Sequence, residues 1–253
     1  MKSGYVKGEV ADHIGRITFY HPAHNSLPGH LLRDLTAHIS QLGEYPDCKV
    51  ILLQSTGDST FCAGASFEEL AAIEDEKQGK AFFCGFAHVI NAMRKCPKLI
   101  IGRVHGKAVG GGVGLIAAAD YCIGLSNGSI KLSELALGIG PFVIGPVVER
   151  KIGLSAYSQL AISCSEWQTA DWALRKGLYQ ELVDSTEDLD NHLNKLLHDL
   201  VKYNPKALGA FKKTLWAGTE DWDDLLEQRA AISGSLILDD AAQEAISAFK
   251  NRK

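Results

Sequence analysis

The sequence lacks any long apolar run. No stretch of its 253 residues approaches the ~20 consecutive apolar residues that a membrane-spanning helix requires. The segment Met1–Val10 has no apolar signal core and carries Glu9, so it resembles neither a secretory signal nor a typical transit peptide. We therefore expect a cytoplasmic protein that does not bind a membrane.

The sequence also lacks a marked excess of either charge. Its 26 Lys and Arg residues against 30 Asp and Glu residues give a formal net charge of −4. Such a balance gives no general electrostatic reason to bind nucleic acid, and an anionic ligand would need a local basic cluster. With 46% hydrophobic and 22% charged residues, the composition is that of a soluble globular protein.

The cysteines lack the spacing of a metal site or a redox motif. None of the six forms a CxxC pair, and none has a histidine at metal-ligand spacing. Several lie in apolar runs, where cysteine acts as a small hydrophobic residue. We predict no metal site, and we predict buried free thiols at Cys48, Cys62, Cys84, Cys96, Cys122 and Cys164.

Strand-like and helix-like segments alternate along most of the chain and then give way to helices. Alternating or continuous apolar runs predict strands at residues 5–10, 14–20, 49–54, 98–104, 121–125 and 129–131. Helical spacing predicts helices at 28–42, 67–73, 80–94 and 113–119. From Thr186 onward the pattern is only helical, which indicates an α/β fold with a helical C-terminal region.

Two loops place small residues between a strand and a helix. They are Thr60–Phe67 and Gly106–Gly112. A backbone amide at the start of a helix has no partner within the helix, and its positive end points outward. Two such amides that converge would stabilise an oxygen that gains negative charge. The alternative is that both loops are ordinary tight turns, since glycine clusters are common in loops.

The second loop also admits a nucleotide-binding interpretation. Gly112–Ala117 fits the GxGxxA form of a dinucleotide fingerprint, and Glu134 follows about 20 residues later. Against this interpretation, the connection from Val104 is long, and two further glycines precede the motif. The loop also lacks the Lys-Ser/Thr pair that ends a phosphate-binding P-loop.

Taken together, the motifs resemble those of the crotonase (enoyl-CoA hydratase/isomerase) family. The resemblance includes Phe61–Ala65, the series Pro97–Gly112, and Glu134 in a Glu-x-x-Leu-Gly sequence. His21–Leu27 is similar to the family's Pro–Asn–Ala/Ser–Leu segment, and Asn204–Lys212 also fits. The resemblance covers about residues 5 to 250 and is specific only through the combination of motifs.

This resemblance implies a fold and an assembly. The expected fold is α/β, with a repeated ββα spiral core at residues 1–200 and a helical C-terminal trimerisation region at 201–253. No clear periodic repeat is visible in the sequence itself. The resemblance also implies a homotrimer or a dimer of trimers.

The resemblance further implies an acyl-CoA site. The amides of Ala65 and Gly111 would bind the thioester oxygen as an enolate forms. No separate cofactor is expected, because coenzyme A enters as part of the substrate. The residues expected to contact coenzyme A are Ala23, Asn25, Ser26, Leu27, Ala63, Phe67, Phe211 and Lys212. For Lys212, a solvated helix face is the alternative.

The carboxylates favour one reaction within this family. Glu134 matches the family's catalytic glutamate, although a helix-cap or surface glutamate is the alternative. Family hydratases resemble one another in a second glutamate, and Gly114 occupies that position here. A single glutamate, followed by Pro141-Phe142, favours a Δ3,Δ2-enoyl-CoA isomerase that moves a proton between C2 and C4. Hydration, decarboxylation of a β-carboxylated acyl-CoA, and a non-catalytic acyl-CoA-binding subunit remain alternatives.

Overall fold

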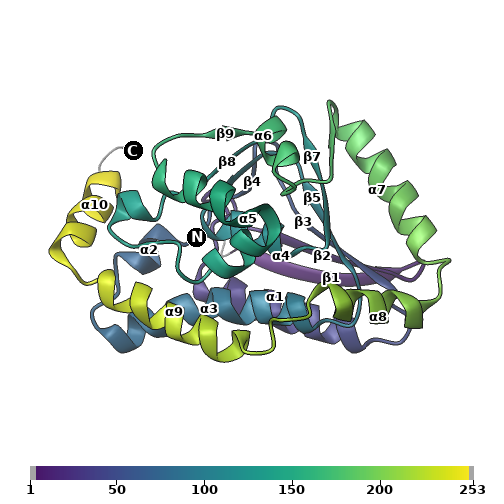
Figure 1. Ribbon diagram of the computed structural model, residues 1–253, viewed down its shortest axis with the longest axis horizontal. Coiled ribbons are helices and arrows are strands. Elements are labelled where there is room, and N and C mark those ends of the chain that lie inside the picture. Colours follow the sequence, from purple (N-terminus) through teal and green to yellow (C-terminus); the bar gives the residue numbers. More distant parts are fainter. Residues whose placement is uncertain (1–3, 251–253) are drawn as a thin grey trace.

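The computed structural model describes residues 4–250, and within them the strands form two sheets. The larger sheet has six strands in the order β1-β2-β3-β5-β7-β10 (Figure 1). β1 and β2 form an antiparallel hairpin, and the other neighbours are parallel. The strands are β1 (Tyr5–Ala11), β2 (Ile14–Tyr20), β3 (Val50–Ser55), β5 (Ile100–Val104), β7 (Tyr121–Leu125) and β10 (Glu181–Val183).

The smaller sheet shows how the chain repeats. Its order is β4-β6-β8-β9, and its strands are β4 (Thr60–Cys62), β6 (Lys107–Val109), β8 (Ser129–Lys131) and β9 (Gln168–Thr169). The successive pairs β3/β4, β5/β6 and β7/β8 each give one strand to each sheet and are each followed by helical structure. The expected ββα spiral is therefore confirmed.

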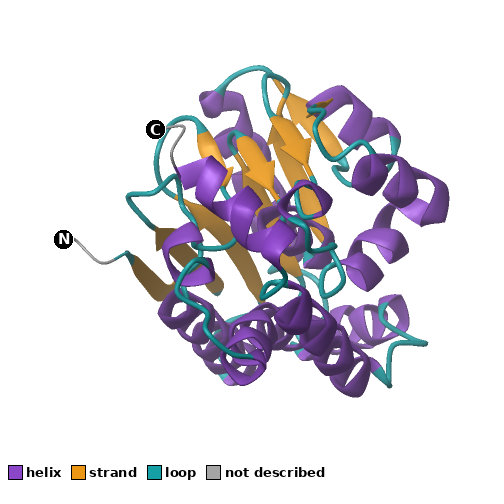
Figure 2. Cartoon of the chain, turned by 90° about the vertical axis from the view of Figure 1, so that its left-hand side faces the viewer, coloured by secondary structure: helices purple, strands orange, loops and turns teal. Residues whose placement is uncertain are grey.

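Helices cover both sides of the strands, as Figure 2 shows. The helices of the core are α1 (Gly29–Glu44), α2 (Phe67–Leu70), α3 (Glu76–Lys95), α4 (Gly111–Ala118), the short 3₁₀ helix η1 (Leu135–Leu137), α5 (Gly145–Ile162) and α6 (Ala170–Arg175). Four more follow: α7 (Thr186–Leu200), α8 (Pro205–Leu215), α9 (Trp222–Leu236) and α10 (Asp240–Lys250). The helical C-terminal region is therefore also confirmed.

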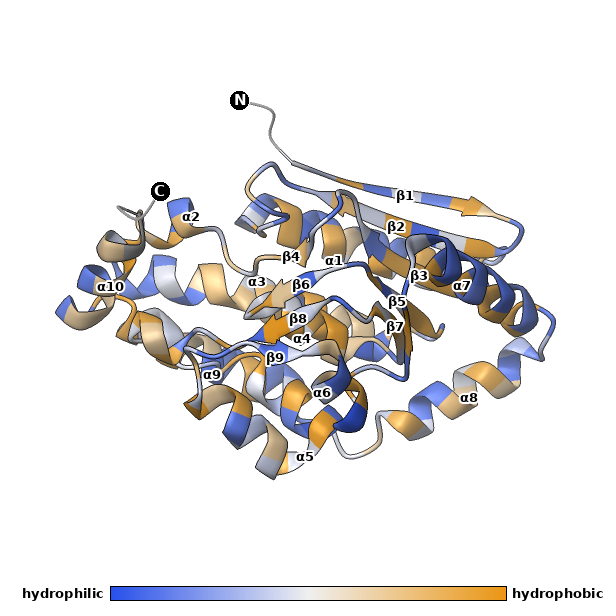
Figure 3. Ribbon diagram, turned by 90° about the horizontal axis from the view of Figure 1, so that it is seen from above, coloured by the Kyte–Doolittle hydropathy of each residue, from blue (hydrophilic) through white to orange (hydrophobic). Residues whose placement is uncertain are grey.

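The two faces of the larger sheet bury two separate apolar clusters. Along β3, Ile51 and Leu53 contribute to the main core, whereas Val50 and Leu52 contribute to a second cluster. This division follows from the alternation of side chains along a strand. The second cluster is covered by the leucines of α7, which lies beside β3, β5 and β7 in Figure 3.

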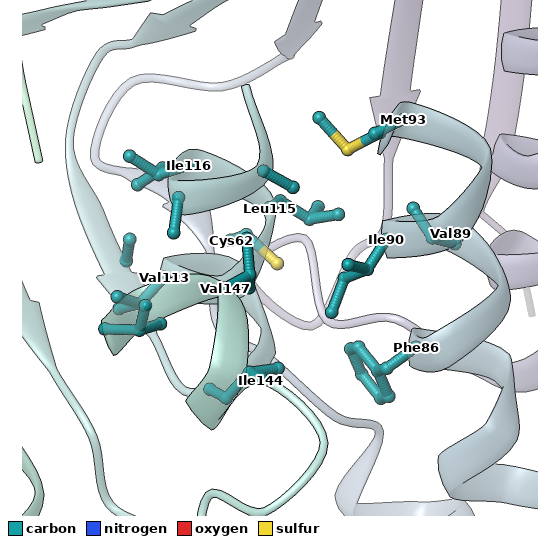
Figure 4. Close-up of a cluster of buried hydrophobic side chains, with 14 of the residues drawn as sticks. Cys62, Phe86, Val89, Ile90, Met93, Val113, Leu115, Ile116, Ile144 and Val147 are labelled. Carbon is teal, nitrogen blue, oxygen red and sulfur yellow. The ribbon is translucent and has the colours of Figure 1, made fainter. Parts of the chain in front are cut away.

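Helix α4 lies at the centre of the main core. All eight of its residues are buried, so it has no polar face. Figure 4 shows the side chains of α4 between those of α3 and α5. The residues of this cluster include Phe86, Val89, Ile90 and Met93 of α3, Val113, Leu115 and Ile116 of α4, Ile144 just before α5, and Val147 of α5.

The C-terminal helices share this core. Helix α9 packs along α3, and its buried residues Trp222, Leu226 and Ala230 belong to the main cluster. α10 adds Ala242 and Ile246 to the same cluster. The region after residue 200 therefore contributes to the same core as the ββα units.

The expected elements differ from the observed ones mainly where strands are short. β4, β6 and β9 have two or three residues each, too few for alternation to be visible in the sequence. α4 begins at Gly111, earlier than the expected Val113, because the two residues before Val113 are glycines, which predict a loop. Between residues 4 and 250, no helix is both long and apolar enough to cross a bilayer. The cytoplasmic location stays a prediction.

Candidate active site

The two small-residue loops pack directly against each other. Gly64 has φ 82°, and a Cβ atom added to it would lie 2.7 Å from Val109 O and 3.3 Å from Gly111 N. A Cβ atom on Gly112 would lie 2.6 Å from Cys62 O. Such distances leave no room for a side chain, so glycine at these positions permits the close approach. The approach brings the segment after β4 to the start of α4.

The amides of Ala65 and Gly111 both border one pocket and remain available as donors. Gly111 is the first residue of α4, so its N–H has no partner within the helix. In the described part of the chain, no backbone carbonyl accepts a hydrogen bond from either amide. Gly110, which precedes Gly111, has φ 52°, a conformation that favours glycine. Two unpaired amides that border one pocket are the groups that an oxyanion hole requires.

The pocket that these amides border holds about 550 Å³, counting its open mouth. Most of its lining is apolar, with Phe83 and Phe86 from α3 and residues 139–144 from the segment before α5. Its polar side chains are Ser133, Glu134 and Ser233. Among the described residues that line the pocket, Glu134 carries the single carboxylate. The expected residues that line it are Ala63, Ala65, Phe67, Gly111 and Glu134.

The carboxyl group of Glu134 lies beside the oxyanion loops. Oε1 would be 2.7 Å from a Cβ atom on Gly110, the residue before α4. Glu134 is half-buried as a whole, but its Oε2 atom is buried and has no hydrogen-bond partner among the described residues. Because this oxygen atom is buried, the carboxyl group behaves electrostatically as a buried acid.

Burial changes the acidity of this carboxyl group. Loss of hydration raises the pKa of Glu134 from 4.5 to about 7, while the backbone amides of Glu134 and Ser133 act in the opposite direction. A carboxyl group with this pKa can accept and return a proton near neutral pH. The helix-cap alternative is not supported, since Glu134 precedes η1 without making a side-chain cap.

The segment expected to contact coenzyme A lies along the first oxyanion loop. Leu27 N donates to Gly64 O at 2.7 Å, and Ala63 N donates to His24 O at 3.1 Å. Leu27 also forms an isolated parallel bridge with Ala65. The structure thus brings residues 23–27 together with Ala63 and Ala65.

Within this segment, the polar side chains bind other parts of the chain. Asn25 Nδ2 donates to Thr56 O at 2.7 Å and to Thr60 O at 2.9 Å. Ser26 Oγ lies 3.0 Å from His21 Nδ1. Asn25 and Ser26 are both buried, whereas Ala23 is exposed. Asn25 and Ser26 therefore hold the shape of the segment, and Ala23 is the member that a ligand can reach.

Phe211 and Lys212 lie outside this group, on α8. Phe211 is exposed, and neither residue lines the pocket. Lys212 is only 2% exposed, and its Nζ donates to Asp120 Oδ2 at 2.8 Å and to Lys98 O at 3.0 Å. The buried Asp120 carboxylate requires a positive partner, and Lys212 provides it. Lys212 therefore has an internal partner, Asp120, in place of the expected coenzyme A phosphate. It does not lie on a solvated helix face.

Gly114 has a neighbour that the sequence did not indicate. A Cβ atom on Gly114 would lie 2.6 Å from Ile144 Cγ2. Ile144 is 4% exposed and lines the pocket just before α5. An apolar side chain thus fills the space beside Gly114. Sequence analysis missed Ile144 because its role depends on how α5 packs against α4.

The fold and the site define a member of the crotonase superfamily. Residues 9–253 match the model of the family described as enoyl-CoA hydratase/isomerase. The chain belongs to the enoyl-CoA hydratase/isomerase family.

Similar proteins within the family differ in their named reactions. A short-chain-enoyl-CoA hydratase of Clostridium acetobutylicum is 26% identical over 243 residues, which cover 95% of this chain and 92% of the relative. A peroxisomal Delta(3,5)-Delta(2,4)-dienoyl-CoA isomerase of Arabidopsis thaliana is 26% identical, with 90% and 86% covered. A carnitinyl-CoA dehydratase of Escherichia coli is 29% identical, with 79% and 76% covered.

A solved structure agrees with the fold. The crystal structure of an enoyl-CoA hydratase from Bacillus halodurans superimposes with a TM-score of 0.89 at 24% identity. The superposition covers 96% of this chain and 99% of that one. This similarity identifies the fold, and the choice of reaction rests on the site.

Proposed function

We propose that this protein is an enoyl-CoA isomerase that moves a double bond from C3 to C2 of an acyl-CoA through a thioester enolate. The observation that carries the proposal is the single carboxylate of the described pocket lining, Glu134, which is buried beside the two free amides. Proton transfer between two carbons needs one group that accepts and then returns a proton. Glu134 has the position and the pKa for this task.

The chemistry follows from the arrangement of the three groups. The thioester oxygen accepts hydrogen bonds from the amides of Ala65 and Gly111. Glu134 removes a proton from C2, and the electron pair moves onto the thioester oxygen, where the two amides stabilise the charge. The same carboxyl group then delivers the proton to C4, and the double bond forms between C2 and C3. The proposed proton transfers involve no metal and no separate cofactor.

Hydration is the second candidate, because two of the similar proteins are named as a hydratase and a dehydratase. Addition of water to a double bond requires a held water molecule as well as a proton donor. Family hydratases resemble one another in having a second glutamate. At that position this chain has Gly114, and Ile144 fills the adjacent space. An apolar side chain there cannot orient water, which supports isomerisation over hydration.

The replacement Glu134→Gln tests the proposal. It keeps the shape of the side chain and removes its ability to transfer a proton. We expect the turnover of a 3-enoyl-CoA to fall by roughly 10²- to 10⁴-fold, with little change in KM. Glu44→Gln, at an exposed residue of α1, serves as a matched control and should retain full turnover.

Wild-type turnover decides between the reactions. On 3-enoyl-CoA and 2-enoyl-CoA of matched chain length, isomerisation should exceed hydration. Hydration as fast as isomerisation would contradict the single-carboxylate argument. If neither reaction occurs and a β-carboxyacyl-CoA loses carbon dioxide instead, the protein is a decarboxylase. If acyl-CoA binds without any turnover, the protein is a binding subunit.

A further inference from the structure

Helix α9 forms part of the pocket wall because it crosses α3 at very short range. A Cβ atom on Gly79 of α3 would lie 2.5 Å from Gly234 O, and a Cβ atom on Gly234 would lie 2.4 Å from Lys80 N. Only glycines allow two helix backbones to approach this closely. The neighbouring residue Ser233 is thereby brought to the pocket, which it lines.

The hydroxyl group of Ser233 has no hydrogen-bond partner. Ser233 is only 1% exposed, and none of the hydrogen bonds of the described residues includes its Oγ. Serine and threonine in helices commonly bond back to a carbonyl one turn earlier. Thr36 does so with Leu32 O at 2.9 Å, and Thr214 does so with Ala210 O at 3.0 Å. Among the described residues, Ser233 Oγ is not one of the fully enclosed polar atoms without a partner, so it opens onto the pocket, where a ligand can supply the missing hydrogen bond.

The position of Ser233 is distant from the thioester oxygen. Gly111, at the oxyanion hole, packs against Phe86, because a Cβ atom on Gly111 would lie 2.2 Å from Phe86 Cε1. Ser233 adjoins the crossing at Gly79, which precedes Phe86 on α3 by two helical turns, a rise of about 10 Å. Ser233 therefore faces the acyl chain rather than its thioester end.

The pocket that Ser233 lines is mainly apolar. Side chains from α2, α3 and the segment before α5 supply Leu70, Phe83, Ile139 and Val143 to its lining. A plain hydrocarbon chain would satisfy these side chains and leave the Ser233 hydroxyl unpaired. An oxygen atom on the chain would satisfy both, since a hydroxyl can donate and accept hydrogen bonds.

We propose that Ser233 is a specificity-determining residue that hydrogen-bonds an oxygen atom carried by the acyl chain. The preferred substrates are then acyl-CoAs with a hydroxyl or oxo group on the chain, rather than unsubstituted ones. The inference rests on the proposed function only in assigning this pocket to the acyl chain.

The test measures binding, with no need for turnover. The probes are pairs of unreactive acyl-CoA thioethers of increasing chain length, which differ only in a hydroxyl or a methyl group at the chain end. Calorimetry of the wild type should show at least one hydroxyl member bound about five- to tenfold more tightly than its partner. In Ser233→Ala this preference should vanish, while the methyl member binds as before.

The control and the contrary outcomes are well defined. Ser235→Ala changes a serine of the same helix whose Oγ donates to Glu76 Oε1 at 3.0 Å, and it should keep the preference. A wild type without preference at any chain length, or a preference that persists in Ser233→Ala, would overturn the role of Ser233. If the preference is found but no isomerisation occurs, only the proposed reaction fails. If no thioether binds, the acyl-CoA pocket itself is wrong.

Discussion

Glu134 is buried beside Gly110 with one carboxyl oxygen unpaired, an arrangement that weakens the fold. Water would stabilise the ionised carboxylate better than this pocket does, which is why the pKa rises to about 7. The same burial prepares the group to transfer protons. Two measurable pH dependences follow, one of the rate and one of the stability.

For the rate, Glu134 must be ionised to accept a proton. We therefore expect kcat/KM for 3-enoyl-CoA to rise with pH through about 7 and to level off above it. A pH–rate profile of the wild type measures this dependence. A profile that stays flat across this range would show that Glu134 is not the base.

For the stability, the folded pKa of Glu134 lies above the unfolded value of 4.5. Below pH 4.5 Glu134 is protonated in both the folded and the unfolded state, so its ionisation does not change the unfolding free energy. As the pH rises toward 7, the unfolded state loses its proton first, so the wild type is progressively destabilised. We expect the unfolding free energy of Glu134→Gln relative to wild type to increase over this range, by about 3 kcal/mol in total. Urea unfolding at several pH values measures it, and a constant difference would contradict it.

At this scale the sequence predicted the residues that belong to local motifs. Glu134, Ala65 and Gly111 were predicted to meet, and the structure brings them to one pocket. Ile144 and Ser233 were not predicted, because each reaches the pocket through the packing of two helices distant in sequence. The sequence on either side of Ile144 and of Ser233 is ordinary in composition, so no local pattern predicts a role for these two residues.

Among the elements, α8 is fixed by a buried ion pair rather than by apolar contacts alone. The side chains of Lys212 and Asp120 are 2% and 3% exposed. Asp120 also accepts hydrogen bonds from Trp216 Nε1 at 3.0 Å and Ile100 N at 2.7 Å. This network joins α8 to the beginnings of β5 and β7.

Removal of the Lys212 charge should therefore destabilise the protein. Lys212→Met leaves the Asp120 carboxylate buried without its cation, at a cost of about 3–5 kcal/mol in unfolding free energy. Asp120→Asn combined with Lys212→Met should recover part of this loss, and Lys213→Met, at the exposed neighbour, should have little effect. Denaturant unfolding measures all three. A stable Lys212→Met variant with weakened acyl-CoA binding would instead restore the expected coenzyme A contact.

The long elements could be predicted from the sequence, whereas most of the short strands could not; the three-residue β8 is the exception. α1, α3 and α7 have a buried face at helical spacing, which identified them. β4, β6 and β9 become strands only because the ββα repeat places them next to one another. Their two or three residues carry no pattern of their own.

In the whole molecule, α5 and α8 each expose large apolar side chains. The two helices are in contact through Arg150, whose Nη2 donates to Leu215 O at 2.6 Å. Leu154 of α5 is 66% exposed, and Phe211 of α8 is 54% exposed. Large exposed apolar side chains commonly mark protein interfaces. These side chains of α5 and α8 are candidates for the contact between subunits of the expected trimer.

We therefore expect a trimer or a hexamer in solution. Sedimentation at micromolar concentration should show one of these for the wild type. A combined Leu154→Asp and Phe211→Asp variant should dissociate, because the charges would be buried without partners. Tyr45→Ser removes an exposed aromatic side chain elsewhere and should leave the assembly unchanged. A monomeric wild type would contradict the expectation.

The crossing of α3 and α9 at Gly79 and Gly234 also sets an order of events during synthesis. Domains fold as the chain emerges from the ribosome, at about 5–20 residues per second. The oxyanion loops and Glu134 emerge well before α9, so the newly made site has its reactive groups but lacks the wall at Ser233. Until α9 emerges, α3 lacks the helix that packs along it, so the core and the pocket wall at Ser233 can be completed only after α9 has been made.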